Sequence, residues 1–174
     1  AMGDAPDQDT PESEESGENE PEAAPRLAGR DPRPSLWVLV AAGAGLSWFT
    51  SSGPDIFDAG ELAVAVWELG GSHAPGQPLY SIAAHLFTSV PLGPLPWRIA
   101  LFSTFCAVGA AWTTGHLANE IRVMLATPDA PISKLAHVVP SVAALASLGA
   151  PVVLRNTLRI EVYTLALCLT LGSI

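Results

Sequence analysis

The sequence predicts an all-α protein in which about four transmembrane helices follow a disordered acidic tail. Three observations predict this class: long runs without charged residues, prolines and glycines that punctuate these runs, and charge concentrated near the N-terminus. Residues 1–34 hold 10 of the 17 acidic residues, whereas residues 35–174 carry a net charge of only −2. Because the chain has no basic patch, we expect no nucleic-acid partner.

The tail, residues 1–34, is rich in Glu, Asp, Pro and Ser and contains almost no large apolar side chains. Such a segment cannot bury enough surface to offset the entropy lost on ordering. We therefore predict a disordered tail, followed at 35–174 by the N-terminal part of a multi-span membrane domain. Cys106 and Cys168 lie inside apolar runs without the spacing of a zinc site, which favours free thiols.

Four apolar runs are the candidate spans, at about 36–53, 98–118, 135–154 and 161–174. A helix needs roughly 20 apolar residues to cross a bilayer. The first run is short, and the arginines before it leave a removable signal peptide as an alternative to an uncleaved span. Pro140 and Pro151 interrupt the third run, but prolines are tolerated in membrane helices. The last run is still apolar at Ile174, so we expect a piece of a larger protein that is inactive alone.

Residues 54–97 connect the first two runs and contain two shorter helical patterns. "ELAVAVWELGG", residues 61–71, predicts a short helix that ends at the Gly-Gly pair. Residues 79–92 are apolar-biased but too few to span, which favours an interfacial or re-entrant helix.

Lysine and arginine near the membrane ends predict the orientation. Arginines precede the first run, and Arg122 and Lys134 flank the loop between the second and third runs, whereas 54–97 contains neither residue type. We therefore expect a bacterial inner-membrane protein with a cytoplasmic N-terminus and an external 54–97 loop. Because each span takes the chain to the other side of the membrane, the turn 155–165 must also lie outside. Arg155 and Arg159 in this turn depart from the positive-inside rule, which indicates a function.

Two polar motifs lie in the external loop. "DAGE" places Asp58 and Glu61 three residues apart at a helix start, either as a relative of the capping box or as carboxylates whose partial desolvation suits a general base. "HAPGQPLY" contains His73 and Tyr80. Its turn residues explain most of the motif structurally, but a helix that folds back would bring His73 near Asp58.

A third motif, "RIEVYTL", begins the last run. Snorkelling of Arg159 to the headgroups and placement of Tyr163 in the aromatic belt would explain both residues structurally. Glu161 indicates a polar interior or an ion pair with a neighbouring arginine, because a carboxylate that enters a span rarely faces lipid. Arg98, at the start of the second run, is expected to be an interfacial anchor.

In this order, "DAGELA", "HAPGQPLY" and "EVYTL" resemble an integral-membrane glycosyltransferase family of the GT-C architecture. This family was long catalogued as a domain of unknown function and includes protein O-mannosyltransferases. Its usual forms are close to D-x-G-E-L, H-P-P-G-Y-P-L-Y and E-V-Y-x-L, so this chain departs from them at Ala74 and Gln77. The resemblance covers about 50–174, the N-terminal part of the family's domain.

The resemblance implies transfer of a sugar, with mannose as the candidate, from a polyprenyl-phosphate-linked donor to a hydroxyl acceptor such as protein Ser or Thr. The reaction would take place at the external face of the lipid bilayer. Carried onto this chain, Asp58 would be the catalytic base and Glu61 its supporting carboxylate. From the topology, we expect Arg155 and Arg159 to bind the donor phosphate through charge-assisted hydrogen bonds. The expected substrate-binding residues are His73, Tyr80, Arg155, Arg159, Glu161 and Tyr163.

Enzymes of this architecture differ in their use of a divalent metal, which therefore stays open as a cofactor. Asp55, Asp58 and Glu61 are oxygen donors of a suitable type, but their spacing does not define a site. The competing hypothesis is a non-enzymatic polytopic membrane protein, a transporter fragment or a scaffold, in which the acidic loop only caps helices.

Overall fold

The computed structural model describes residues 33–53, 58–73, 76–126, 136 and 138–173. Nearly all of the predicted acidic tail lies outside these residues, as do Asp55, Ala74 and positions 127–134 of the predicted cytoplasmic loop. Every regular element in the described part is an α-helix. The all-α prediction is therefore confirmed.

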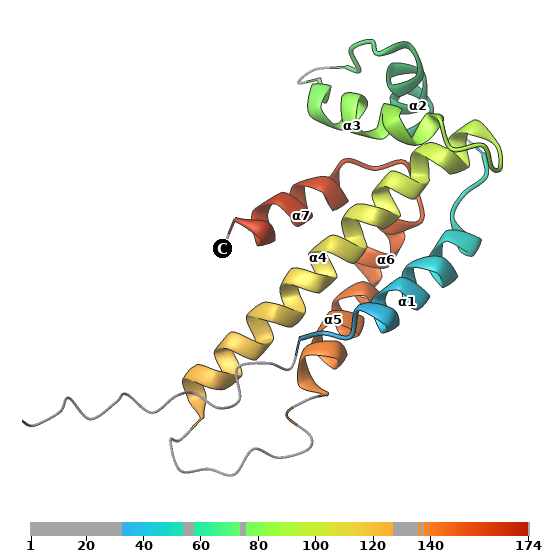
Figure 1. Cartoon of the computed structure of the whole chain (residues 1–174). Helices are drawn as coiled ribbons and strands as arrows, with labels where there is room; N and C mark the ends of the chain where they lie inside the picture. The colour runs from blue at the N-terminus through green and yellow to red at the C-terminus, as the bar shows by residue number, and fades with distance from the viewer. Residues whose placement is uncertain (1–32, 54–57, 74–75, 127–135, 137, 174) are drawn as a thin grey trace, which may run out of the picture.

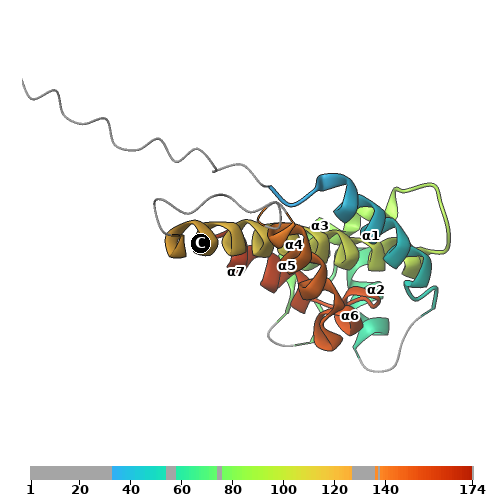
Figure 2. The same ribbon diagram turned by 90° about the horizontal axis from the view of Figure 1, so that it is seen from below.

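The described residues form seven helices, of which the long helix α4 is central. They are α1 (Leu36–Phe49), α2 (Ala59–Glu68), α3 (Pro78–Thr88), α4 (Leu95–Leu125), α5 (Val139–Gly149), α6 (Pro151–Thr157) and α7 (Tyr163–Gly172). In Figure 1, α1, α5 and α6 lie along one side of α4 and α7 along the other, while α2 and α3 form a hairpin beside its N-terminal end. In the view from below, α1 and α6 lie to opposite sides of α4 (Figure 2).

The number of spans differs from the prediction. Among the described residues, α4 is the one helix that is long and apolar enough to cross a bilayer. The pair α5 and α6 meets the same requirement only when taken together, across a bend of 70°. α1 and α7 are apolar but have only 14 and 10 residues. The described helices thus support one span, or two if the bent pair is one span, and not four.

Pro151 explains why 135–154 is not one straight helix. Proline lacks the N–H of an internal helix position, and its ring collides with the carbonyl four residues earlier. Ala150 adopts ψ 128°, the extended value that a residue before proline prefers. The new helix α6 begins at Pro151, where no N–H is needed. The run predicted as the third span is therefore a bent pair of helices, which meets the requirement for a span only as a pair.

The two short helices of the 54–97 segment are present, as predicted. α2 ends at Glu68, and Leu69 takes the left-handed conformation with φ 53°, while its N–H bonds to the Ala65 carbonyl. The helix therefore ends just before the predicted Gly-Gly pair. A left-handed leucine costs on the order of 1 kcal/mol, and here it turns the chain back along α2.

The apolar core consists of two clusters along α4. The first joins α2, α3, the N-terminal half of α4 and the turn after α6, and the second joins α1, α4 and α5. Alanines dominate the α4 side of the second cluster, which lets the helices approach closely. The buried members include Leu62, Val66, Tyr80, Ala84, Ile99, Phe102 and Ile160 in the first cluster, and Leu39, Ala107, Ala111, Ala144 and Leu148 in the second.

Arg98 stabilises the turn between α3 and α4. Its Nε donates to the carbonyls of Leu92 and Gly93, both at 3.0 Å, and Nη1 donates to the carbonyl of Thr88 at 3.1 Å. These carbonyls lie at and beyond the C-terminal end of α3, where helix carbonyls lack intrahelical partners. The residue expected to be an interfacial anchor is thus engaged with the protein backbone and holds the α2–α3 hairpin on α4.

Candidate active site

Asp58 stands immediately before α2. It occupies the N-cap position, but its backbone is helical (φ −76°, ψ −6°) and its side chain makes no capping hydrogen bond. The expected capping-box geometry is therefore wrong. The side chain of Asp58 is 64% exposed, so its carboxylate is accessible to a substrate.

Glu61, in the first turn of α2, binds the loop that follows this helix. One carboxylate oxygen accepts the backbone N–H of His73, and Oε2 lies 3.0 Å from Nδ1 of the same residue. The reversal of the chain after Leu69 makes this contact feasible. Glu61 thus connects the start of α2 to the "HAPGQPLY" motif.

His73 also faces Asp58, as the fold-back of the helix led us to expect. Its Nε2 lies 3.7 Å from Oδ2 of Asp58, while its Nδ1 contacts Glu61. About half of the His73 side chain is exposed. The structure therefore brings Asp58, Glu61 and His73 into one acidic cluster, in which the imidazole stands between two carboxylates.

The contacts with His73 determine the protonation of Glu61. The backbone N–H of His73, and then its ring, hold the pKa of Glu61 below its ordinary value of 4.5. Because the folded pKa is lower than the unfolded one, the contact stabilises the fold fully above about pH 4.5 and is lost as the pH falls through the lowered pKa. At neutral pH a charged carboxylate therefore holds the loop.

A second set of contacts positions the "RIEVYTL" motif. The hydroxyl of Ser103 on α4 donates to the carbonyl of Glu161 at 3.1 Å, and it lies 3.3 Å from the hydroxyl of Tyr80. The next residue, Thr104, donates to the carbonyl of Thr157 at 3.1 Å. All of these residues except Glu161 are buried. The site residues predicted from the sequence did not include Ser103 and Thr104. The feature that could have indicated them is the pair of adjacent hydroxyl side chains inside the apolar "LFSTF".

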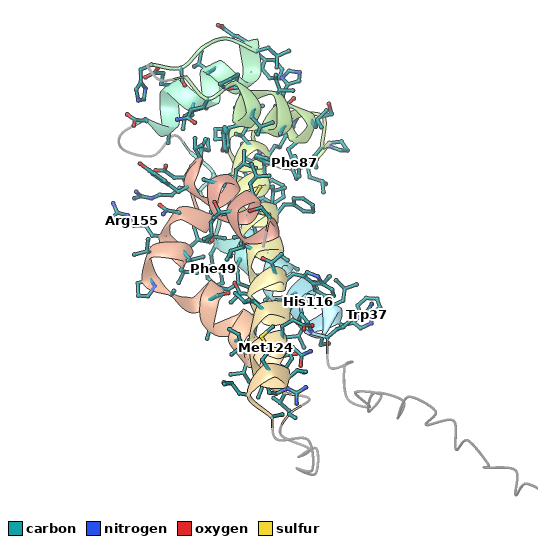
Figure 3. The ribbon with its side chains drawn as sticks, turned by 90° about the vertical axis from the view of Figure 1, so that its left-hand side faces the viewer. Trp37, Phe49, Phe87, His116, Met124 and Arg155 are labelled. Carbon is teal, nitrogen blue, oxygen red and sulfur yellow. The ribbon has the colours of Figure 1, made fainter. Side chains whose placement is uncertain are left out.

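The remaining predicted site residues lie around this turn. Arg155 is exposed on α6, and Figure 3 shows it on the outer side of that helix, away from α4. Tyr163 is 68% exposed at the start of α7, and Arg159 and Glu161 are half-buried. No hydrogen bond or ion pair between described residues joins Arg155 or Tyr163 to the acidic cluster. The structure thus forms two groups of predicted residues, and their roles in binding stay predictions.

An apolar groove of about 210 Å³ lies between the second and third motifs. Gly76 shapes its first wall, because it adopts φ 74° and its N–H closes a turn on the carbonyl of His73 at 2.8 Å. The hydrogen bond between Gly76 and His73 therefore links the acidic cluster to the groove. The lining residues are Gly76, Gln77, Pro78, Leu79 and Tyr80 on one side, and Val162, Leu165, Ala166 and Leu169 on α7 and just before it.

The metal hypothesis finds no donor set in the described part of the chain. No group of three or more His, Cys, Asp or Glu side chains there is arranged to hold an ion. Both oxygens of Glu61 face His73, and Asp55 lies outside the described residues.

Comparison with families of known proteins gives a match. The family model described as "Protein O-mannosyl-transferase TMEM260 N-terminal domain" matches residues 58–171. The match begins at Asp58 and takes in α2 to α6 and all but the last residue of α7. Neither a curated protein nor a solved structure matches the chain.

Proposed function

Since the chain belongs to the family of protein O-mannosyl-transferase TMEM260 N-terminal domains, we propose that it forms part of a membrane glycosyltransferase. The enzyme moves a sugar, with mannose as the first candidate, from a polyprenyl-phosphate donor to a hydroxyl group of a protein serine or threonine. The family membership agrees with the resemblance drawn from the three motifs. The donor, the acceptor and the external membrane face belong to the proposal.

The observation that carries this proposal is the acidic cluster at the start of the matched segment. Asp58 is exposed and lies next to a histidine, without any capping bond to occupy it. A carboxylate so placed suits a general base, because it must reach a hydroxyl proton in the bound substrate. Glu61 is less suited to that task, since both of its oxygens are engaged with His73.

The proposed reaction needs one base. The acceptor hydroxyl attacks the anomeric carbon, Asp58 takes the hydroxyl proton, and the bond between that carbon and the phosphate oxygen breaks. The leaving group is already a phosphate, so it needs no carboxylic acid to protonate it, in contrast to the two-carboxylate chemistry of ordinary glycosidases. Arg155 and Arg159 are proposed to bind the donor phosphate through charge-assisted hydrogen bonds.

The apolar groove between the second and third motifs is a candidate for the first isoprene units of the donor. It adjoins the loop that contains His73, and its lining is mostly apolar. Gln77 stands in this wall where the related motif usually has an aromatic residue. We therefore expect a weaker or differently shaped contact with the donor at this position.

Exposed apolar side chains support a membrane location. On α1, Trp37 and Trp48 are 80% and 87% exposed, and Phe105 and Met124 on α4 are 67% and 80% exposed. Large apolar side chains exposed to this extent are typical of a surface that lipid or protein covers. Under the proposal, α4 spans the bilayer.

Replacement of the proposed base tests the function. We expect Asp58→Asn in the full-length protein to reduce transfer from polyprenyl-phosphate mannose to a Ser/Thr peptide by about 100-fold or more, the contribution typical of a general base. The matched control is Glu68→Gln, at the other end of α2, which should leave transfer unchanged. Unchanged transfer in Asp58→Asn, at wild-type protein levels, would remove Asp58 from the mechanism.

A further inference from the structure

The contact between Glu61 and His73 determines which ring nitrogen carries the proton. Above about pH 4.5 Glu61 is ionised, and an ionised carboxylate only accepts hydrogen bonds. Nδ1 of His73, 3.0 Å from Oε2 of Glu61, must therefore be the protonated nitrogen. In the neutral ring, Nε2 then bears the lone pair, so His73 is oriented as a proton acceptor on its other side.

Nε2 is directed toward Asp58. Its distance of 3.7 Å from Oδ2 is longer than a hydrogen bond, so no proton is shared between them in this state. A lone pair and an ionised carboxylate oxygen that face each other repel, and a proton placed between them removes the repulsion. Nε2 of His73 and Oδ2 of Asp58 are therefore placed to share a proton once Asp58 has accepted one.

The surroundings of the imidazole suit a temporary positive charge. Among the described residues, Asp58, just before α2, and Glu61, in its first turn, are the ionisable groups that pair with the ring within 4.0 Å. A protonated ring would therefore stand between two negative charges. About half of each of the three side chains or more is exposed, so water can remove the proton after the reaction.

We infer that His73 is a proton relay that acts through Asp58 and is oriented by Glu61. This inference rests on the proposed function. The acceptor O–H bond breaks as the new bond from oxygen to the anomeric carbon forms, and Asp58 takes the proton. Asp58 passes this proton to Nε2 of His73, the sugar–phosphate bond breaks with its electron pair on the phosphate, and the imidazolium later loses the proton to water. The relay returns Asp58 to its ionised form for the next turnover.

The pH profile of transfer separates a relay from a structural contact. Histidine is the side chain that changes charge between about pH 5 and 8, and a protonated His73 accepts no proton. We expect wild-type kcat to fall as the medium becomes acidic. His73→Gln should lower kcat by roughly tenfold or more, leave the donor KM unchanged, and shift the acid limb to lower pH. A uniform decrease without a shift would overturn the relay.

The pH profile of the Glu61→Gln variant is a second test, which does not depend on the folding of a His73 variant. Its amide oxygen keeps a hydrogen-bond acceptor for Nδ1 but removes the negative charge, so protonation of the imidazole becomes harder. The acid limb should therefore move to lower pH, whereas in the matched control Glu68→Gln it should stay in place. An unmoved limb in Glu61→Gln, with transfer retained, would contradict the relay.

Chemical rescue completes the test. Because the His73 side chain is half exposed, added imidazole can reach its position in His73→Ala and should restore part of the lost kcat, but should not rescue Asp58→Asn. A folded His73→Ala protein without rescue would count against the relay. Loss of activity in Asp58→Asn together with unshifted profiles overturns the relay alone, whereas full activity in Asp58→Asn overturns the proposed function.

Discussion

Tyr80 closes the second motif and is the largest fully buried side chain in the described part of the chain, with 1% exposure. Its ring packs edge-on against Phe102 at 5.4 Å, and its hydroxyl lies 3.3 Å from the hydroxyl of Ser103. Burial raises the pKa of this phenol, so the hydroxyl stays neutral. The position of Tyr80 suggests a structural contribution to the site, through the serine that also holds the Glu161 backbone.

Substitution of this residue separates structure from substrate binding. We expect Tyr80→Phe to lower the free energy of unfolding by about 1 kcal/mol, the net value of one hydrogen bond, because Ser103 retains Glu161 as a partner. The donor KM should not change. Thermal unfolding and steady-state kinetics of the purified protein provide the measurement. A raised donor KM with unchanged stability would instead support the predicted role of Tyr80 in substrate binding.

At the scale of the helices, the close approach of α4 to α5 depends on Gly115. A Cβ at this position would lie 2.7 Å from the carbonyl oxygen of Pro140 and 3.0 Å from the ring of Pro34. The first of these atoms is backbone, so it cannot move without shifting α5. This glycine thus determines how closely α4 packs on α5, the helix that leads to α6 and Arg155.

Gly115→Ala should therefore destabilise the protein by about 1–3 kcal/mol, the range for overpacking a close contact. Gly45→Ala is the matched control, since it lies in α1 and a Cβ there meets no atom within 4 Å. The control should leave stability unchanged or raise it by up to about 1 kcal/mol, because alanine favours helix more than glycine does. Equal melting temperatures for the two variants would contradict the packing argument.

The sequence predicted the existence of the helices better than their lengths and breaks. Apolar periodicity and turn residues placed α2 and α3 within a few residues, because local signals determine short helices. The break at Pro151 was missed, since the same residue can kink a membrane helix or end it and only packing decides. The length of α4 was underestimated at both ends, because residues 95–97 and the mixed segment 119–125 also continue the helix.

The candidate site was also predictable only in part. The approach of His73 to Asp58 followed from a helix that folds back, but the stronger contact with Glu61 depends on the left-handed Leu69, which no pattern indicated. Ser103 and Thr104 were missed because hydroxyl residues in an apolar run usually bond only to their own helix. Their long-range partners, the carbonyls of Glu161 and Thr157, become visible only in the folded chain.

At the scale of the whole molecule, the account depends on the two ends of α4. Its 31 residues correspond to about 46 Å, which exceeds the roughly 30 Å hydrocarbon core of a bilayer. The α2–α3 hairpin lies beside the N-terminal end of this helix, and Met124 lies at the opposite end (Figure 3). The turn that follows α6 contacts α4 near the hairpin, through Ser103 and Thr104.

The most direct test is cysteine labelling from outside intact cells, in a full-length protein in which Cys106 and Cys168 are replaced. We predict that a membrane-impermeant maleimide labels Asp58→Cys and Arg155→Cys, while Met124→Cys reacts only after the membrane is permeabilised. The exposed fractions of Asp58 and Met124 are 64% and 80%, so accessibility within the protein does not limit either reaction. Labelling of positions 58 and 155 from opposite sides, or of 58 and 124 from the same side, would contradict the account.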